Sequence, residues 1–262
     1  MEIPKFIGQE TSDLEKYFRS NNKRLIQKWT HYFDVYEHHF SRFRNMDVVI
    51  LEIGIFQGGS LQMWKDYFGP KAKIYGIDIN PKCKDLEEEN IKVFIGSQSD
   101  RKFLREMKEK IPPVDILIDD GGHTMRQQNV TFDELFEHVK ENGVYLCEDL
   151  HTSYHKSYGG GYRRMGTFIQ KSKRFIDYLN AYHSRESFFR VNSFTRSVHS
   201  LHYYDSMLII EKQNREKPFD EQTGKPSYEF SRSDTFSSGK AAEFLKRIIT
   251  IVAGVFRLPG LK

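Results

Sequence analysis

Cysteine is scarce in this sequence, and the little that is present argues against two structural roles. Cys83 and Cys147 are the only cysteines among the 262 residues, and they stand far apart in the chain. Two isolated thiols give neither the pattern of a disulfide framework nor the paired spacing of a zinc site. A reducing compartment is therefore the expected setting of the protein.

Long apolar runs are also missing. The longest apolar stretch, 248–256, is interrupted by Thr250 and Gly254. It has roughly half of the ~20 residues that a helix needs to span a bilayer. The first ten residues, MEIPKFIGQE, contain no apolar core of the kind found in signal peptides. We therefore expect a soluble, cytoplasmic protein without a transmembrane segment.

Charge of one sign is not concentrated anywhere along the chain. The formal net charge is +4 at pH 7, and the Lys and Arg residues are scattered over the sequence. Proteins that bind nucleic acids usually carry a basic patch or stripe. The sequence therefore gives no reason to expect a nucleic acid as a partner. Its 38% hydrophobic and 29% charged residues are typical of a soluble globular protein.

Short apolar runs alternate with helix-sized segments from Asp47 onward. Repeated strand–helix units favour a parallel sheet with helices on both faces. Two later runs, around a turn at Tyr204-Asp205, predict an antiparallel pair at the edge of the sheet. The predicted strands are 48–53, 74–77, 93–95, 114–118, 144–147, 197–203 and 207–210. The predicted helices between them are 60–68, 83–90, 100–110 and 127–141.

The segments on either side of this core have a different character. Ser12 followed by Glu15 has the spacing of a capping box, which predicts a helix beginning near Asp13. A second helix is predicted over 22–33. Residues 212–240 are polar and contain prolines, glycine and many serines, which is typical of a linker. The predicted organisation is a helical segment 1–45, a core 46–212, a polar linker 213–240 and a C-terminal helix 241–262.

Glycines join the first predicted strand to the helix that follows it. The strand ends near Glu52, and Gly54, Gly58 and Gly59 precede Ser60. Glycines at such a turn let the backbone approach a ligand at the carboxyl edge of a sheet. The spacing is not the G-x-G-x-x-G of dinucleotide-binding proteins. Glu52 would repel a pyrophosphate, but it suits the ammonium group of a methionine moiety.

Polar side chains follow the next two predicted strands. Asp78 stands at a strand end about twenty residues after the glycines, where a carboxylate can accept hydrogen bonds from both ribose hydroxyls. Polar residues after the third strand can line an adenine ring, and Asp100 among them is equally suited to cap the next helix. This pattern favours S-adenosylmethionine over NAD. The residues assigned to the cofactor are Glu52, Gly54, Gly58, Ser60, Asp78, Asn80, Ser97 and Gln98.

Carboxylates and a histidine follow the fourth and fifth predicted strands. Asp119, Asp120 and His123 come after one, and Glu148 and Asp149 come after the other. Because parallel strands place their carboxyl ends together, we expect these residues to converge beside the methyl donor. So much negative charge is costly without a cation. Oxygen ligands favour a hard divalent ion such as Mg²⁺, or Mn²⁺, over zinc.

The proposed reaction explains why such a group would be useful. An aliphatic hydroxyl is a weak acid, and its oxygen must lose the proton as it attacks a sulfonium methyl group. A bound metal acts as a Lewis acid on that oxygen, and a histidine can accept the proton near neutral pH. In the simpler interpretation, Asp119 and Asp120 cap the following helix and His123 is an ordinary loop residue.

The sequence resembles the macrolide-sugar O-methyltransferase family, which includes the mycinamicin and macrocin O-methyltransferases. The likeness extends from about Tyr32 to Lys212. It is carried by Tyr36-Glu37-x-His-Phe40, Leu51-Glu-Ile-Gly, Gly59-Ser-Leu-x-Met-Trp64, Tyr75-Gly-Ile-Asp78, Ile118-Asp-Asp-Gly-x-His123 and Glu148-Asp-Leu-x-Thr-Ser-Tyr154. The resemblance implies a Rossmann-like class I methyltransferase fold. In it, helices flank a mostly parallel seven-stranded sheet that has an antiparallel edge strand.

The resemblance also implies a function and a set of roles. The enzyme would use S-adenosylmethionine and Mg²⁺ to methylate a hydroxyl of a sugar on a glycan or glycosylated natural product. Asp120, Glu148 and Asp149 would hold the metal, His123 would be the general base, and Asp119 would support the cofactor site. The loop 151–164 is a candidate substrate lid. Its candidate substrate contacts are His151, Tyr154 and Tyr158.

Other classes of protein stay open on the sequence alone. A metal-dependent catechol or phenol O-methyltransferase would use a similar ion with flat aromatic walls. A non-catalytic subunit with the same fold would not need both the carboxylates and the histidine. A nucleic-acid methyltransferase would be expected to carry an Asn/Asp-Pro-Pro-Tyr motif, and a nicotinamide oxidoreductase a different glycine spacing. The sequence leaves a homo-oligomer open.

Overall fold

The computed structural model describes residues 11–228. The chain divides into two compact units, Met1–Pro218 and Phe219–Lys262. Within the second unit, the described residues 219–228 form neither helix nor strand. The helix predicted over 241–262 lies outside the described residues. No helix in the described part of the chain is both long and apolar enough to cross a membrane.

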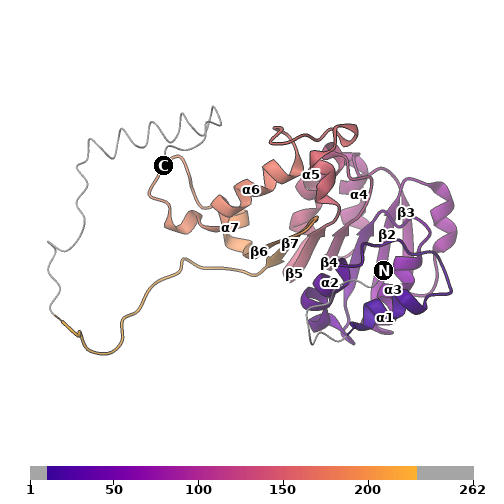
Figure 1. The fold of residues 1–262 in the computed structure, drawn as a ribbon, viewed down its shortest axis with the longest axis horizontal. Helices are drawn as coiled ribbons and strands as arrows, with labels where there is room; N and C mark the ends of the chain where they lie inside the picture. Colours follow the sequence, from indigo (N-terminus) through magenta and orange to yellow (C-terminus); the bar gives the residue numbers. More distant parts are fainter. Residues whose placement is uncertain (1–10, 229–262) are drawn as a thin grey trace. The chain divides into compact units, whose positions relative to one another are not determined.

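A seven-stranded sheet forms the centre of the first unit (Figure 1). The strands are β1 (Val49–Ile53), β2 (Lys73–Asp78), β3 (Ile91–Ile95), β4 (Val114–Asp119), β5 (Val139–Cys147), β6 (Val198–Tyr204) and β7 (Met207–Lys212). Their order in the sheet is β3-β2-β1-β4-β5-β7-β6. Strands β1 to β5 are parallel, whereas β7 is antiparallel to both β5 and β6. The predicted sheet, with its antiparallel edge, is confirmed.

Helices cover both faces of this sheet. They are α1 (Asp13–Ser20), α2 (Tyr32–Phe40), α3 (Gly59–Phe68), α4 (Arg101–Lys110), α5 (Met125–Leu135), α6 (Phe168–Leu179) and α7 (Ser193–Ser197). Alternate residues of β1 enter two different cores: Ile50 packs with residues of α1 to α3, and Leu51 with residues of α4 to α7. Burying one such side chain contributes roughly 1.5–3 kcal/mol. Burial on both faces explains why the strands form uninterrupted apolar runs.

The predicted start of the first helix is confirmed, whereas three other predicted helices are wrong in part. The Oγ of Ser12 accepts a hydrogen bond from the Glu15 amide at 3.2 Å, so α1 begins where predicted. The helix predicted over 127–141 ends at Leu135, because the chain turns and enters β5 at Val139. The helix predicted over 83–90 is a short 3-10 turn, Pro81–Leu86.

The helix predicted over 22–33 is wrong for residues 22–31, because α2 begins only at Tyr32. The side chain of Asn21 accepts from the Lys23 amide at 3.1 Å and donates to the Arg24 carbonyl at 2.9 Å. Such local bonds compete with helix formation. The 21–31 segment instead passes over the start of α3. A Cβ at Gly59 would lie only 2.4 Å from the carbonyl oxygen of Leu25, so this close crossing requires glycine there.

Candidate active site

A cavity of about 700 Å³ opens at the carboxyl edge of the parallel strands. The strand ends and the 21–31 segment both line it. Three large apolar side chains on its wall are exposed: Trp29 by 55%, Phe56 by 56% and Ile79 by 71%. Exposed apolar side chains that surround a concave site with polar groups are typical of a ligand pocket.

The predicted site residues fall into three groups around this cavity. Those that line it are Gly54, Asp78, Asn80, Ser97, Gln98, Asp120, His123, Glu148 and Asp149. Glu52, Gly58, Ser60 and Asp119 do not line it, and all four are buried. His151 and Tyr154 line a separate cavity of about 310 Å³, and Tyr158 lines neither of the two.

The glycine loop after β1 lies directly against the loop after β4. Gly54 has a φ of +86°, and a Cβ there would come within 2.2 Å of the Asp120 carbonyl oxygen. Asp78 holds the same loop, because its Oδ2 accepts hydrogen bonds from the amides of Ile55 and Phe56, both at 3.1 Å. The two loops are therefore fixed side by side at the cavity.

Glu52 is fully buried beneath this loop. Its Oε2 accepts hydrogen bonds from Ser60 Oγ at 2.8 Å and from the Trp64 indole at 3.2 Å. Its Oε1 lies 3.7 Å from the Nζ of Lys28. Burial raises the pKa of Glu52, although Lys28 acts in the opposite direction. Glu52 therefore anchors α3 to β1 and adds negative charge behind the cavity wall.

Lys28 is not among the predicted site residues, yet it occupies the middle of the carboxylates. Its side chain is 2% exposed, and its Nζ lies 2.5 Å from Asp120 Oδ2 and 3.0 Å from Glu148 Oε1. The partners are 92 and 120 residues away in the chain. Nothing in the local sequence sets Lys28 apart from the other lysines. Only the path of the 21–31 segment brings it into the site.

Helix α2 supplies two further residues that were not predicted. The hydroxyl of Tyr36 donates to Glu148 Oε1 at 2.6 Å, and the hydroxyl of Tyr32 donates to Asp149 Oδ1 at 2.8 Å. Residues four apart share one face of a helix, so a single face of α2 serves both carboxylates. Both tyrosines are also part of the apolar core, and sequence periodicity therefore indicates core residues only.

His123 lies between Asp120 and Asp149. Its Nε2 is 3.5 Å from Asp149 Oδ2 and 3.9 Å from Asp120 Oδ1. Each of the three residues offers one ligand atom, and these atoms all lie within 4.8 Å of one another. The buried Nδ1 of His123 has no hydrogen-bond partner within the described residues. Burial lowers the pKa of His123 even though Asp149 raises it, which favours the neutral ring that can accept a proton.

The buried charges do not balance. Glu52, Asp120 and Glu148 share the single ammonium group of Lys28. Burial raises the pKa of Asp120 to about 7 and that of Glu148 to about 8, and the nearby Lys28 only partly offsets this. Carboxylate oxygens suit a hard divalent ion, and such an ion would supply the missing positive charge. The residues present therefore fit a magnesium site.

Several known proteins are similar to this chain in sequence. No family model matches the chain. Demethylmacrocin O-methyltransferase of Streptomyces fradiae is 36% identical over 205 residues, which cover 73% of this chain and 51% of that protein. Mycinamicin VI 2''-O-methyltransferase of Micromonospora griseorubida is 35% identical over 188 residues, 68% of this chain and 47% of that protein. The chain resembles sugar O-methyltransferases.

The name of another relative specifies a rhamnosyl sugar. The 8-demethyl-8-(2-methoxy-alpha-L-rhamnosyl)-tetracenomycin-C 3'-O-methyltransferase of Streptomyces olivaceus is 45% identical over 139 residues, 50% of this chain and 35% of that protein. The chain thus spans about half or less of the length of the curated relatives it matches.

A solved structure shows the same fold. The MycE methyltransferase of the mycinamycin biosynthetic pathway, in complex with Mg, SAH and mycinamycin VI, superimposes with a TM-score of 0.68 at 31% identity. The match covers 78% of this chain and 53% of MycE. The described part of this chain therefore has the Rossmann-like class I methyltransferase fold.

Gln98 and Asp119, both predicted to belong to the cofactor site, also contact each other and support a neighbouring loop. Gln98 donates to Asp119 Oδ1 at 2.9 Å and accepts from the Gly122 amide at 2.7 Å. Its amide group therefore positions the loop that carries Asp120 and His123. Asp119, 1% exposed, is the buried anchor of that arrangement.

Proposed function

We propose that this chain is an S-adenosylmethionine- and Mg²⁺-dependent O-methyltransferase that methylates a sugar hydroxyl on a glycosylated small molecule. The observation that carries the proposal is the group formed by Asp120, His123 and Asp149, which lines a cavity beside the glycine loop. MycE, which has the same fold, holds Mg and SAH in its structure. The proposed catalytic core is 46–212, and the segment 1–45 contributes Lys28, Tyr32 and Tyr36 to it.

The proposed cofactor lies along the glycine loop and the ends of β2 and β3. Asp78 Oδ1 accepts one hydrogen bond, from the Asn80 amide at 2.9 Å, and a carboxylate oxygen can accept two. One acceptor position on that oxygen is therefore available to a ribose hydroxyl. The apolar side chains of Phe56 and Ile79 offer walls for the adenine ring. A volume of about 700 Å³ falls within the usual range for small-molecule sites.

The proposed metal ligands are Asp120, Glu148 and Asp149. Tyr36 and Tyr32 hold two of these carboxylates in place through their hydroxyl groups. When bound, the ion would polarise the sugar hydroxyl as a Lewis acid. His123 accepts the hydroxyl proton at a ring nitrogen as the oxygen–methyl bond forms and the sulfur–methyl bond of the donor breaks. The products are the methyl ether and S-adenosylhomocysteine.

The proposed acceptor is a deoxysugar attached to an aglycone. The names of two relatives specify rhamnosyl tetracenomycins, and MycE was solved with mycinamycin VI. The small cavity of about 310 Å³ is lined in part by His151 and Tyr154, which belong to the loop proposed as the substrate lid. A small-molecule acceptor agrees with the absence of a basic stripe in the sequence.

The test is methyl transfer from labelled S-adenosylmethionine to a panel of rhamnosides and catechols, with Mg²⁺ or with EDTA. We expect label in a glycoside, and we expect EDTA to lower the rate by roughly 10²-fold or more, because the ion's Lewis-acid contribution amounts to several kcal/mol. Mg²⁺ added back in excess should restore the rate. Transfer to catechols alone would overturn the sugar assignment, and transfer that EDTA leaves unchanged would overturn the metal assignment.

A further inference from the structure

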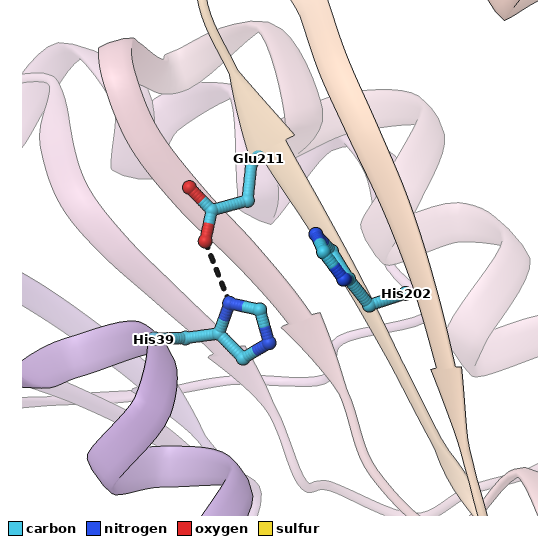
Figure 2. A group of neighbouring side chains, drawn as sticks. All are labelled: His39, His202 and Glu211. Carbon is cyan, nitrogen blue, oxygen red and sulfur yellow. Dashed lines mark hydrogen bonds and ion pairs between the residues drawn. The ribbon is translucent and has the colours of Figure 1, made fainter.

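A second group of metal-binding side chains lies away from the cavity. His39 of α2, His202 of β6 and Glu211 of β7 point toward one another, as Figure 2 shows. Each offers one ligand atom, and these atoms lie within 4.8 Å of one another. His39 is 1% exposed, and its Nδ1 is 2.6 Å from Glu211 Oε1. None of the three lines the 700 Å³ cavity.

The Nε2 atom of each imidazole ring lies within hydrogen-bond distance of a hydroxyl group. His39 Nε2 is 3.0 Å from the hydroxyl of Tyr204, and His202 Nε2 is 2.9 Å from Ser200 Oγ. At 2.6 Å, the Nδ1–H of His39 donates to Glu211 Oε1, and a metal would replace this proton. When each ring donates its Nε2–H to the hydroxyl oxygen, the lone pair of Nδ1 is left to bind the ion. Metal-binding histidines usually donate their other N–H in this manner, because the bond fixes the tautomer and the ring orientation.

The carboxylate is oriented in the same way. Glu211 Oε2 lies 2.7 Å from Arg42 Nη1, which leaves Oε1 facing His39. The side chain of Glu211 is 15% exposed, and His202 is only partly buried, so water can reach the group. Water is the usual fourth ligand where three protein side chains bind zinc.

We propose that His39, His202 and Glu211 form a binding site for a late first-row divalent ion such as Zn²⁺. Two imidazoles with one carboxylate are softer donors than the oxygen-rich group at the cavity, and imidazole suits Zn²⁺ and its neighbours. Ligand atoms about 2.0–2.1 Å from a tetrahedral ion lie roughly 3.3 Å apart. To reach that separation, His39 Nδ1 and Glu211 Oε1 must move apart from 2.6 Å, and the partly exposed His202 side chain must rotate to bring its donor atom to a similar distance from both.

Such an ion would act on the candidate active site through α2. His39 lies three residues after Tyr36, on the helix whose tyrosines bind Glu148 and Asp149. The ion would tie this helix to the β6–β7 hairpin, because its ligands come from all three elements. Zinc would therefore stabilise the position of α2, whether or not the chain is a methyltransferase.

The test uses the untagged 262-residue chain carrying Asp120→Asn, so that the oxygen-rich group takes up less zinc. Zn²⁺ affinity is measured by competition with a chromogenic chelator, and Co²⁺ is used as a second probe whose visible absorption reports nitrogen ligation. We expect one equivalent of Zn²⁺ to bind, and His202→Ala to weaken it by on the order of 10²-fold. The Co²⁺ absorption should disappear in the same variant.

A matched control separates this site from other histidines. His199 is exposed and lies on the same strand, so His199→Ala should leave both signals unchanged. Circular dichroism of His202→Ala checks that the fold is kept, which we expect because His202 lies at the edge strand. The proposal is overturned if no equivalent of Zn²⁺ binds. It is also overturned if His202→Ala binds Zn²⁺ as tightly as its parent, since the group is then only a hydrogen-bonded ion pair.

Discussion

Replacing His123 with asparagine is expected to lower the rate of methyl transfer by a factor on the order of 10²–10⁴, the usual contribution of a general base. His123 is the partly buried imidazole beside the proposed metal ligands, and its buried Nδ1 has no hydrogen-bond partner within the described residues. Its φ is +54°, a left-handed conformation that asparagine tolerates better than alanine. The substitution therefore removes the base without straining the loop.

Two measurements on the same variant distinguish a general-base role of His123 from a purely structural role. Turnover and cofactor affinity are measured side by side, by product formation and by calorimetric titration of S-adenosylhomocysteine. We expect turnover to fall while cofactor affinity stays at the parent value, because His123 does not hold the glycine loop. His183→Ala, an exposed histidine of the 3-10 turn Ala181–His183, is the matched control and should change neither value. Full turnover in His123→Asn would rule out the general-base role.

Replacing Lys28 with methionine is expected to tighten binding of Mg²⁺ or Mn²⁺ at least tenfold. The Nζ of Lys28 contacts oxygens of Asp120 and Glu148, both proposed as metal ligands. An incoming ion must displace this ammonium or bind beside it. Two unit charges 4 Å apart interact by about 4 kcal/mol at an effective dielectric constant of 20, and about 1.4 kcal/mol corresponds to a factor of ten. Methionine keeps most of the buried volume.

Two measurements distinguish this competition from a simple loss of stability. Mn²⁺ affinity is followed by electron paramagnetic resonance, and thermal unfolding is followed with and without Mg²⁺. Without metal, Lys28→Met leaves buried carboxylates without their ammonium partner, so we expect a lower Tm than in the parent. Added Mg²⁺ should raise the Tm more in the variant than in the parent. Lys23→Met, an exposed lysine of the same segment, is the control. Unchanged or weaker Mn²⁺ binding in Lys28→Met would contradict the competition.

The sheet and the loops at its carboxyl edge could be predicted from the sequence. Val114–Asp119 is buried on both faces, and its apolar run predicts a strand almost to the residue. The rule that parallel strands share a carboxyl edge then brings Asp120 and His123 next to Asp149. These predictions depend on local periodicity and on one topological rule, and neither needs knowledge of distant contacts.

Long-range contacts account for what the sequence did not reveal. In place of the helix predicted over 22–33, the structure has a non-helical segment up to His31. Its side chains bind partners far along the chain: Arg24 donates to the Leu86 carbonyl, and Lys28 donates to Glu148. Tyr36 has the periodicity of a core residue, and it is one, but its hydroxyl also reaches a carboxylate. A residue that serves both the core and the site gives no separate sequence signal.

The most direct test of the central claim is calorimetric titration of S-adenosylmethionine into the folded chain. We predict one binding site, and we predict that Asp78→Asn weakens it, because the carboxylate is the proposed acceptor for a ribose hydroxyl. Asp85→Ala, an exposed acidic residue of the next turn, should bind the cofactor as the parent does. If the correctly folded parent shows no binding of S-adenosylmethionine or of S-adenosylhomocysteine, the cavity is not a cofactor site and the methyltransferase proposal is wrong.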